Sequence, residues 1–140
     1  AALTLAKALT VYEAFGEGDV PDDGQRYFVV SPAGWADLLQ IDQFSRSEYV
    51  GEGDLPYAGG LTAKRWLGFM WFTHSGLSIS STTRDCHAYH KSAVGLAMGS
   101  DIRTEVNYIP EKVSNLITSY MSMGAVMIDN NGAIECQITE

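Results

Sequence analysis

The residues Cys86-His87-Ala88-Tyr89-His90 place two imidazoles and a thiol within five positions. The whole chain has only three histidines and two cysteines, so this is its densest group of side chains suited to metal binding or nucleophilic chemistry. On a helix, Cys86 and His90 share a face as residues i and i+4, and on a strand they share one by two-residue alternation. The pairing of Cys86 with His90 is therefore expected on either backbone.

A metal site needs more ligands than this pair supplies. Zinc in proteins takes three or four, commonly arranged as two close pairs. The remaining candidates are His74 and Cys136, each isolated in the sequence, and His87, which a strand would direct to the opposite face. The sequence thus favours packing and predicts no metal ligand. An intracellular enzyme or metal-binding domain that uses Cys86 and His90 is kept as the alternative function.

The known catalytic and nucleotide-binding motifs are also missing from the sequence. A Cys–His catalytic pair requires an imidazole brought close to the thiol by the fold, whereas the neighbours Cys86 and His87 point apart. No Gly-x-Ser-x-Gly, Walker, Gly-x-Gly-x-x-Gly or His-Glu-x-x-His pattern occurs. Residues 19–24, "DVPDDG", resemble the start of a calcium loop, but Pro21 and Val30 occupy positions that need oxygen ligands. We expect no catalytic residue and no cofactor.

The composition restricts the possible partners. Seventeen acidic and nine basic residues give a net charge of −8, which repels a polyanion. An aromatic group near the middle of the chain could stack on bases, but only Lys64 and Arg65 lie near it, so core or subunit-interface packing is favoured. This group comprises Trp66, Phe69, Trp71 and Phe72. The longest apolar run, residues 66–72, is far shorter than the ~20 residues of a membrane span.

The pattern of apolar and turn residues predicts an α+β fold, with a mixed, largely antiparallel sheet flanked by a few helices. Leu5, Leu9 and Tyr12 form the expected apolar stripe of the first helix. Ser31 and Pro32 are typical of the start of a second helix. The predicted elements are a helix at 3–15, a strand at 26–30, a helix after 31, two strands within 61–77 separated at Gly68, a strand at 84–89, a helix at 90–98, strands at 102–109 and 113–128, and a hairpin turn at 129–132 before a last strand.

Four stretches, taken in order, resemble the major capsid proteins of tailed bacteriophages. They are "VPDDGQRYFVVSPAGWADLLQIDQF", "GGLTAKRWLGFMWFTHSGL", "AYHKSAVGLAM" and "YMSMGAVMIDNNGAIECQI". Each stretch alone is weak, and their common order over residues 10 to 138 carries the resemblance. "AYHKSA" overlaps the Cys86–His90 cluster, so this segment is expected to mark a junction in the fold, with His87 facing outward.

The resemblance implies a Hong-Kong-97-like capsid fold and the C-terminal part of the subunit. Residues 1–140 would form a single fragment, with 16–118 axial-domain-like and 1–15 and 119–140 peripheral-domain-like. The family's N-terminal arm, extended loop and spine helix are expected upstream of residue 1. Residues 42–60 and 78–85 are expected contact loops.

The function implied by the resemblance is structural and not enzymatic: self-assembly into an icosahedral phage or prophage shell that encloses double-stranded DNA. The implied partners are further copies in hexamers and pentamers, with scaffolding, portal or decoration proteins as additional ones. The DNA would be enclosed without sequence-specific binding, and no membrane is involved. The implied location is the virion, after synthesis in the cytoplasm of the host bacterium.

Overall fold

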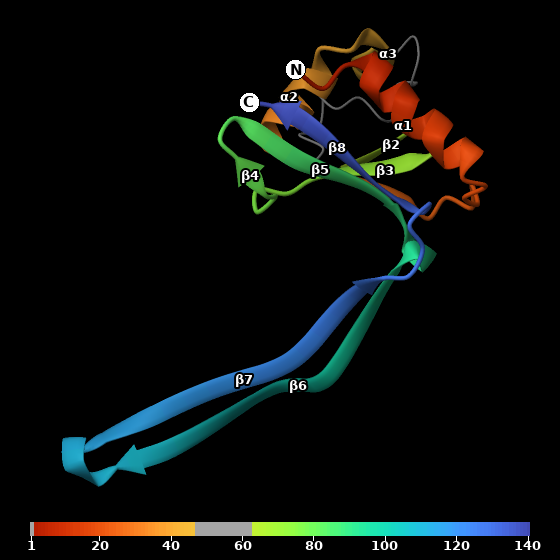
Figure 1. Cartoon of the computed structure of the whole chain (residues 1–140). Helices are drawn as coiled ribbons and strands as arrows, with labels where there is room; N and C mark the ends of the chain where they lie inside the picture. The colour runs from red at the N-terminus through yellow and green to blue at the C-terminus, as the bar shows by residue number, and fades with distance from the viewer. Residues whose placement is uncertain (1, 47–62) are drawn as a thin grey trace.

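The computed structural model describes residues 2–46 and 63–140. They form a sheet covered by helices, from which a long two-stranded arm projects (Figure 1). The elements in chain order are α1 (Leu5–Glu17), β1 (Arg26–Val30), α2 (Pro32–Leu39), α3 (Asp42–Ser45), β2 (Ala63–Trp66), β3 (Phe69–Thr73), β4 (Ile79–Ser80), β5 (Thr83–His90), the 3₁₀ turn η2 (Lys91–Ala93), β6 (Val94–Ile109), the 3₁₀ turn η3 (Pro110–Lys112), β7 (Ser114–Met127) and β8 (Ala133–Thr139).

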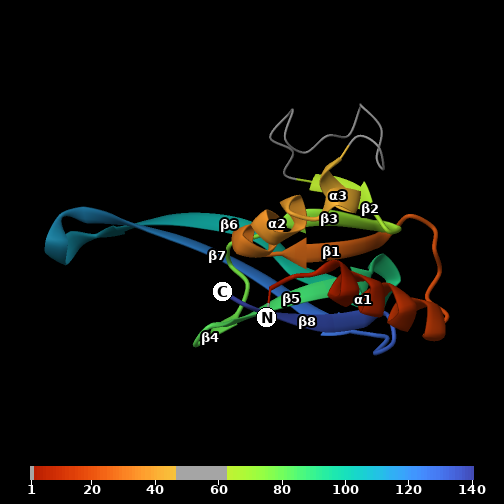
Figure 2. The ribbon, with the colours of Figure 1, turned by 90° about the horizontal axis from the view of Figure 1, so that it is seen from above.

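The sheet of the body has the strand order β2-β3-β1-β5-β4, and β8 also pairs with β5. β1 and β3 run parallel, and every other pair in this sheet is antiparallel. Figure 2 shows the helices over this sheet and the arm extending away from it. The predicted α+β class with a largely antiparallel sheet is confirmed.

The core lies between one face of this sheet and the three helices. Burial alternates along β1, where Phe28 and Val30 point into the core and Tyr27 and Val29 lie on the outer face. The α1 side chains in the core are Ala8, Val11 and Phe15. The predicted stripe of Leu5, Leu9 and Tyr12 is therefore wrong: Leu9 and Tyr12 are exposed. Both sets have helical spacing, and the set that ends in the large Phe15 ring is the one buried.

Several local signals are confirmed. The strand at 26–30 is β1, and Ser31 caps α2 by accepting a hydrogen bond from the Gly34 amide at 3.0 Å. Pro32 takes the first helical position, where a missing amide hydrogen costs nothing. β2 and β3 are separated at Leu67 and Gly68, and both of these residues have positive φ. Residues 78–85, expected as a contact loop, instead include the short strand β4 and the first residues of β5, and their role in contacts stays a prediction. No described helix is long and apolar enough to cross a membrane.

Two predictions near the arm are wrong. Residues 90–98 do not form a helix, because His90 ends β5, a single 3₁₀ turn follows, and β6 begins at Val94. Residues 129–132 do not close a hairpin between the strands around them. β7 pairs with β6 and β8 pairs with β5, so these residues instead join the arm to the body.

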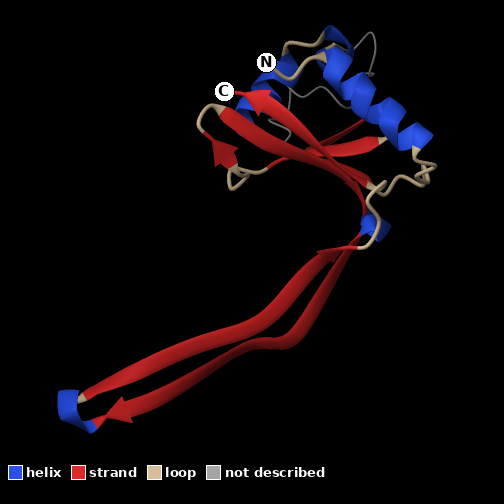
Figure 3. Cartoon of the chain, viewed as in Figure 1, coloured by secondary structure: helices blue, strands red, loops and turns tan. Residues whose placement is uncertain are grey.

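The arm consists of β6 and β7, which form a sheet of their own (Figure 3). The predicted strands at 102–109 and 113–128 lie in β6 and β7. The chain passes from body to arm at Ala93 and Val94, and it returns to the body before β8. α1 and β8 both belong to the body, whereas the expected domain boundaries were at 15/16 and 118/119. Which parts are axial-like or peripheral-like stays a prediction.

Candidate functional site

Cys86, His87 and His90 all lie on β5, with alternating orientation. Cys86 and His90 are buried on the helix-covered side of the sheet, and His87 is exposed, as predicted. A strand rises by about 3.3 Å per residue, so four residues separate Cys86 from His90 by about 13 Å along β5. A shared face therefore does not bring the two side chains into contact, and they cannot act as a catalytic pair or as ligands of one metal ion.

The other candidate ligands do not join them. His74 follows β3 on the surface, and its Nδ1 accepts a hydrogen bond from the Gly76 amide at 3.0 Å. Within residues 2–46 and 63–140, no group of three or more His, Cys, Asp or Glu side chains could hold a metal ion. Cys136 is the one candidate that the fold brings to Cys86, because the two residues are directly opposite in the β5–β8 pairing.

His90 has a structural task at the point where the arm begins. Its Nδ1 accepts hydrogen bonds from the Ser92 amide at 3.2 Å and from the Ser92 hydroxyl at 2.7 Å. Because Nδ1 accepts, the ring hydrogen sits on Nε2, which donates to Asp23 Oδ1 at 2.9 Å. Both ring nitrogens of this buried imidazole are thus used to hold η2 and the loop before β1 together.

Of the four aromatic residues predicted to pack in the core or at a subunit interface, Phe69 and Trp71 lie in the core and Trp66 packs against it. Trp71 and Phe69 are buried, and the Trp71 ring stacks on Phe28 with centroids 4.0 Å apart. The Trp71 indole donates to the Trp66 carbonyl at 2.8 Å. Phe72 lies on the outer face of the sheet and is half-buried. A base-stacking platform would need exposed rings, and none of these four rings is classed as exposed.

The nearby cations are also used within the fold. Lys64 is buried, donates to the Phe44 carbonyl and lies 4.5 Å from the centre of the Phe44 ring. Arg65 donates to the Gly24 carbonyl at 3.3 Å. Neither side chain belongs to a basic groove of the kind that single-stranded nucleic acid requires.

The largest surface feature is the arm, whose two strands have 16 and 14 residues. β6 has two more residues than β7, and the register shifts between Met98 and Ser100 and again between Ser100 and Arg103. These shifts are β-bulges, which bend a strand and increase its twist. In the described structure the arm has two strands only, and its outer edges are unpaired.

One face of the arm is apolar along nearly its whole length. The cross-strand pairs Val94–Met127, Met98–Met123 and Val106–Ile117 share this face, because opposite residues of an antiparallel pair point the same way. The fraction of the side chain exposed is 63% for Val106 and 67% for Ile117. Its apolar members are Val94, Leu96, Met98, Ile102, Val106 and Tyr108 of β6, with Ile117, Met121, Met123, Ala125 and Met127 of β7, and the polar pair Thr104–Ser119 interrupts them.

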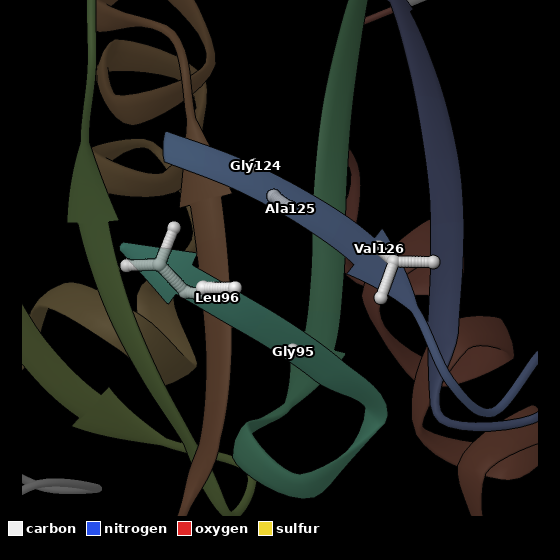
Figure 4. Close-up of a pocket in the computed structure, with 6 residues that line it drawn as sticks. Gly95, Leu96, Gly124, Ala125 and Val126 are labelled. Atoms are coloured by element: carbon white, nitrogen blue, oxygen red, sulfur yellow. The ribbon is translucent and has the colours of Figure 1, made fainter. Parts of the chain in front are cut away.

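The opposite face of the arm is mixed: polar side chains and Leu116 lie toward the tip, and small residues with Val126 lie near the body. Arg103, Glu105 and Asn107 lie on it, and the Tyr120 hydroxyl donates to Glu105 at 3.1 Å. Near the body, residues of both faces, among them Gly95, Leu96 and Val126, line a hollow of about 390 Å³ (Figure 4). The arm is therefore a ribbon with one face more apolar than the other, and this uneven ribbon is called the one-sided apolar arm below. The sequence showed its alternation but did not reveal that it projects from the body.

At the root of the arm the chain crosses twice between body and arm, and backbone hydrogen bonds join these two crossings. The His90 amide donates to the Gly132 carbonyl at 2.8 Å, and the Ile128 amide donates to the Ala93 carbonyl at 2.8 Å. Ala93 and Gly132 pack so closely that a Cβ on Gly132 would lie 2.6 Å from the Ala93 Cβ. The two crossings thus form one tightly packed junction.

Replacing Gly132 with alanine should destabilise this junction by about 1–3 kcal/mol, since the added methyl group must displace Ala93. The matched control is Gly124→Ala, because a Cβ on Gly124 meets no atom within 4 Å. That variant should change the free energy of unfolding by less than about 0.5 kcal/mol. Urea unfolding of both variants measures the difference. Equal effects would contradict the close packing of Gly132 on Ala93.

Acid should weaken the contact between Asp23 and His90. The hydrogen bond from His90 holds the pKa of the Asp23 carboxyl below its usual value, with help from the Gln25 amide. A carboxyl whose pKa is lower in the folded protein stabilises the fold above its unfolded pKa of about 3.9. This contribution disappears as the pH falls through the folded value. Wild type should therefore lose more stability than Asp23→Asn between about pH 5 and pH 3, measured by urea midpoints. Parallel losses in the two proteins would exclude this role for Asp23.

The fold is similar to those of solved phage structures. A structure of Mycobacterium phage Che8 matches with a TM-score of 0.74 and 16% sequence identity over 91% of this chain and 46% of that chain. The capsid structure of the cyanophage P-SCSP1u matches with a TM-score of 0.69 and 18% identity over 96% of this chain and 46% of that chain. At these identities the similarity concerns the fold. The chain spans less than half the length of either match.

The family follows from the sequence itself. The model of the phage capsid protein family matches residues 1–140, so this chain belongs to the phage capsid protein family. No curated protein matches the chain. The predicted resemblance to phage capsid proteins and the predicted capsid fold are confirmed.

Proposed function

We propose that this chain is part of a major capsid subunit that assembles with further copies into a closed icosahedral shell around double-stranded DNA. Membership of the phage capsid protein family supports a structural role in the virion. The finer statements extend it: hexamers and pentamers as the assembly units, and synthesis in the cytoplasm of the host bacterium. Scaffolding, portal or decoration proteins are proposed as additional partners.

The single observation that carries the proposal is the one-sided apolar arm. A two-stranded ribbon by itself is at best marginally stable in water, and apolar faces of this length are rarely left open on soluble monomers. The arm also presents unpaired strand edges that can accept another strand. Both properties are explained if the arm is covered when the complete subunit takes its place in a shell.

The charge of the chain supports enclosure of DNA without sequence-specific binding. A net charge of −8 repels the phosphate backbone, so the genome is expected to stay mobile against this surface. The described cations near the aromatic core, Lys64 and Arg65, bind backbone carbonyls of the body. We propose in addition that the protein is not an enzyme and that His90 has a structural role at the root of the arm.

The proposal is tested by expressing the complete reading frame, alone and together with its neighbouring phage genes. Sedimentation and negative-stain electron microscopy should show closed shells of uniform diameter in at least one of these preparations. Only monomers or small oligomers in both preparations would overturn the proposal.

A further inference from the structure

Cys86 on β5 and Cys136 on β8 lie directly opposite each other in the sheet of the body. Both are free thiols on the helix-covered face, and their exposed fractions are 0% and 8%. β8 pairs with β5 and, in the described structure, with no other strand. The chain therefore places its two cysteines side by side, with one of them on an edge strand.

The backbone geometry permits a disulfide, but not a relaxed one. The His90 amide donates to the Gly132 carbonyl, and the Glu140 amide donates to the Thr82 carbonyl at 2.9 Å. Hydrogen-bonded pairs recur every second residue, so Cys86 and Cys136 also form such a pair, with Cα atoms about 5.5 Å apart. This Cα–Cα distance is suitable for a disulfide. The Cβ atoms of opposite residues, however, lie up to about 5.5 Å apart and must approach to about 4 Å before the bond can form. Closing the bond requires a shift of β8 and leaves strain, which makes the bond easier to reduce.

The two thiols differ in access. Cys136 lines a surface groove of about 290 Å³ between α1 and β8, together with Lys7, Val11 and Gln137. The Lys7 ammonium donates to the Gln137 carbonyl at 2.8 Å. Burial raises the pKa of the Cys136 thiol, and the Lys7 charge opposes this. Cys86, beside Cys136, is fully buried, and burial raises the pKa of its thiol too. Cys136 is thus the thiol that a small reagent reaches first.

We propose that Cys86 and Cys136 form a reversible thiol–disulfide switch that reacts with small soluble disulfides. The Cys136 thiolate attacks one sulfur of the small disulfide, and one small thiol leaves. The Cys86 thiolate then attacks the Cys136 sulfur of the mixed disulfide, and the second small thiol leaves. The protein loses two thiol protons and two electrons, and the small disulfide is reduced to two thiols.

The bond would tie together β5 and β8, the strands that enter and leave the root of the arm. β5 leads into the arm and β8 follows it, so a Cys86–Cys136 bond closes a covalent loop that contains the whole of β6 and β7. If the proposed function holds, a particle that leaves a reducing cytoplasm for oxidising surroundings would acquire this bond. The chemistry of the two thiols can be measured whether or not shells form.

The test treats the folded protein with oxidised glutathione at neutral pH, followed by acid quenching and non-reducing peptide mass spectrometry. The expected product is a peptide pair linked through Cys86 and Cys136, which dithiothreitol returns to two free thiols. Cys86→Ala should retain glutathione on Cys136, and Cys136→Ala should leave Cys86 at least about tenfold slower to react. Alanine is used because a buried serine hydroxyl would need its own partner.

Three outcomes would overturn the proposal: a stable glutathione adduct on Cys136 of the wild type, links between separate chains only, or thiols that react solely after unfolding in urea. Circular dichroism confirms that each variant is folded. Should either variant fail to fold, wild type alone decides, because its oxidised form must show the Cys86–Cys136 link and a higher Tm than its reduced form. The absence of shells would count against the proposed function and leave this result unaffected.

Discussion

Val106→Asp is expected to abolish shell formation while the body of the protein stays folded. Val106 lies on the apolar face of the arm, opposite Ile117, and both side chains are largely exposed in the described structure. Covering this face in an assembled shell would bury the new carboxylate without a partner, which costs several kcal/mol at each copy. Every 1.4 kcal/mol lowers an association constant tenfold, so the loss at a repeated contact should be complete.

The matched control is Asn107→Asp, which places the same carboxylate one residue further on, on the opposite face, opposite Leu116 and on the side of Arg103 and Glu105. This variant should still assemble. Sedimentation and electron microscopy measure shells, and urea unfolding of the unassembled protein measures stability. Shells from both variants, or from neither, would contradict the distinction between the two faces of the arm.

Trp71→Ala is expected to lower the free energy of unfolding by about 3–5 kcal/mol. Trp71 is buried at the centre of the core, stacks on Phe28 and donates its indole hydrogen to the Trp66 carbonyl. Removing it leaves a large cavity and takes away one hydrogen-bond donor of the Trp66 carbonyl. Its neighbour Phe72 points to the outer face of the same strand and is half-buried. Phe72→Ala should therefore cost clearly less, about 1–2 kcal/mol.

Urea unfolding followed by fluorescence and circular dichroism compares the two variants with the wild type. A cost for Phe72→Ala equal to that for Trp71→Ala would mean that the outer face of the sheet is covered as well as the helix-covered face.

Local chemistry explains which elements the sequence predicted. The adjacent residues Ser31 and Pro32 are together sufficient to indicate where a helix begins. The apolar run at 26–30 likewise indicates a buried strand from its own residues alone. The prediction at 90–98 failed because Ala93 and Ala97 suit a helix, while the strand conformation depends on pairing with β7. The turn at 129–132 has hairpin residues, but the strand after it pairs with β5, which lies far back in the sequence.

The candidate site shows the same division between local and non-local information. Cys86 and His90 share a face on a helix and on a strand alike. Because they lie on a strand, about 13 Å of backbone separates them. The opposition of Cys86 and Cys136 follows from strand register, for which neither segment carries a local signal. The alternation of apolar residues in β6 and β7 is the same as in a strand with one face in a protein core. Periodicity does not indicate what covers an apolar face, so the projection of these strands from the body could not be predicted. The contact loops expected at 42–60 fall mostly outside the described residues, and α3 with Arg46 is their described part.

A cryo-electron microscopy reconstruction of particles made from the complete reading frame tests the central claim most directly. The account predicts closed icosahedral shells in which the helix-covered body and the arm are recognisable in every subunit. The apolar face around Val106 and Ile117 should be packed against protein in those shells. Particles in which this face is open to solvent, or a preparation that yields no shells, would contradict the account.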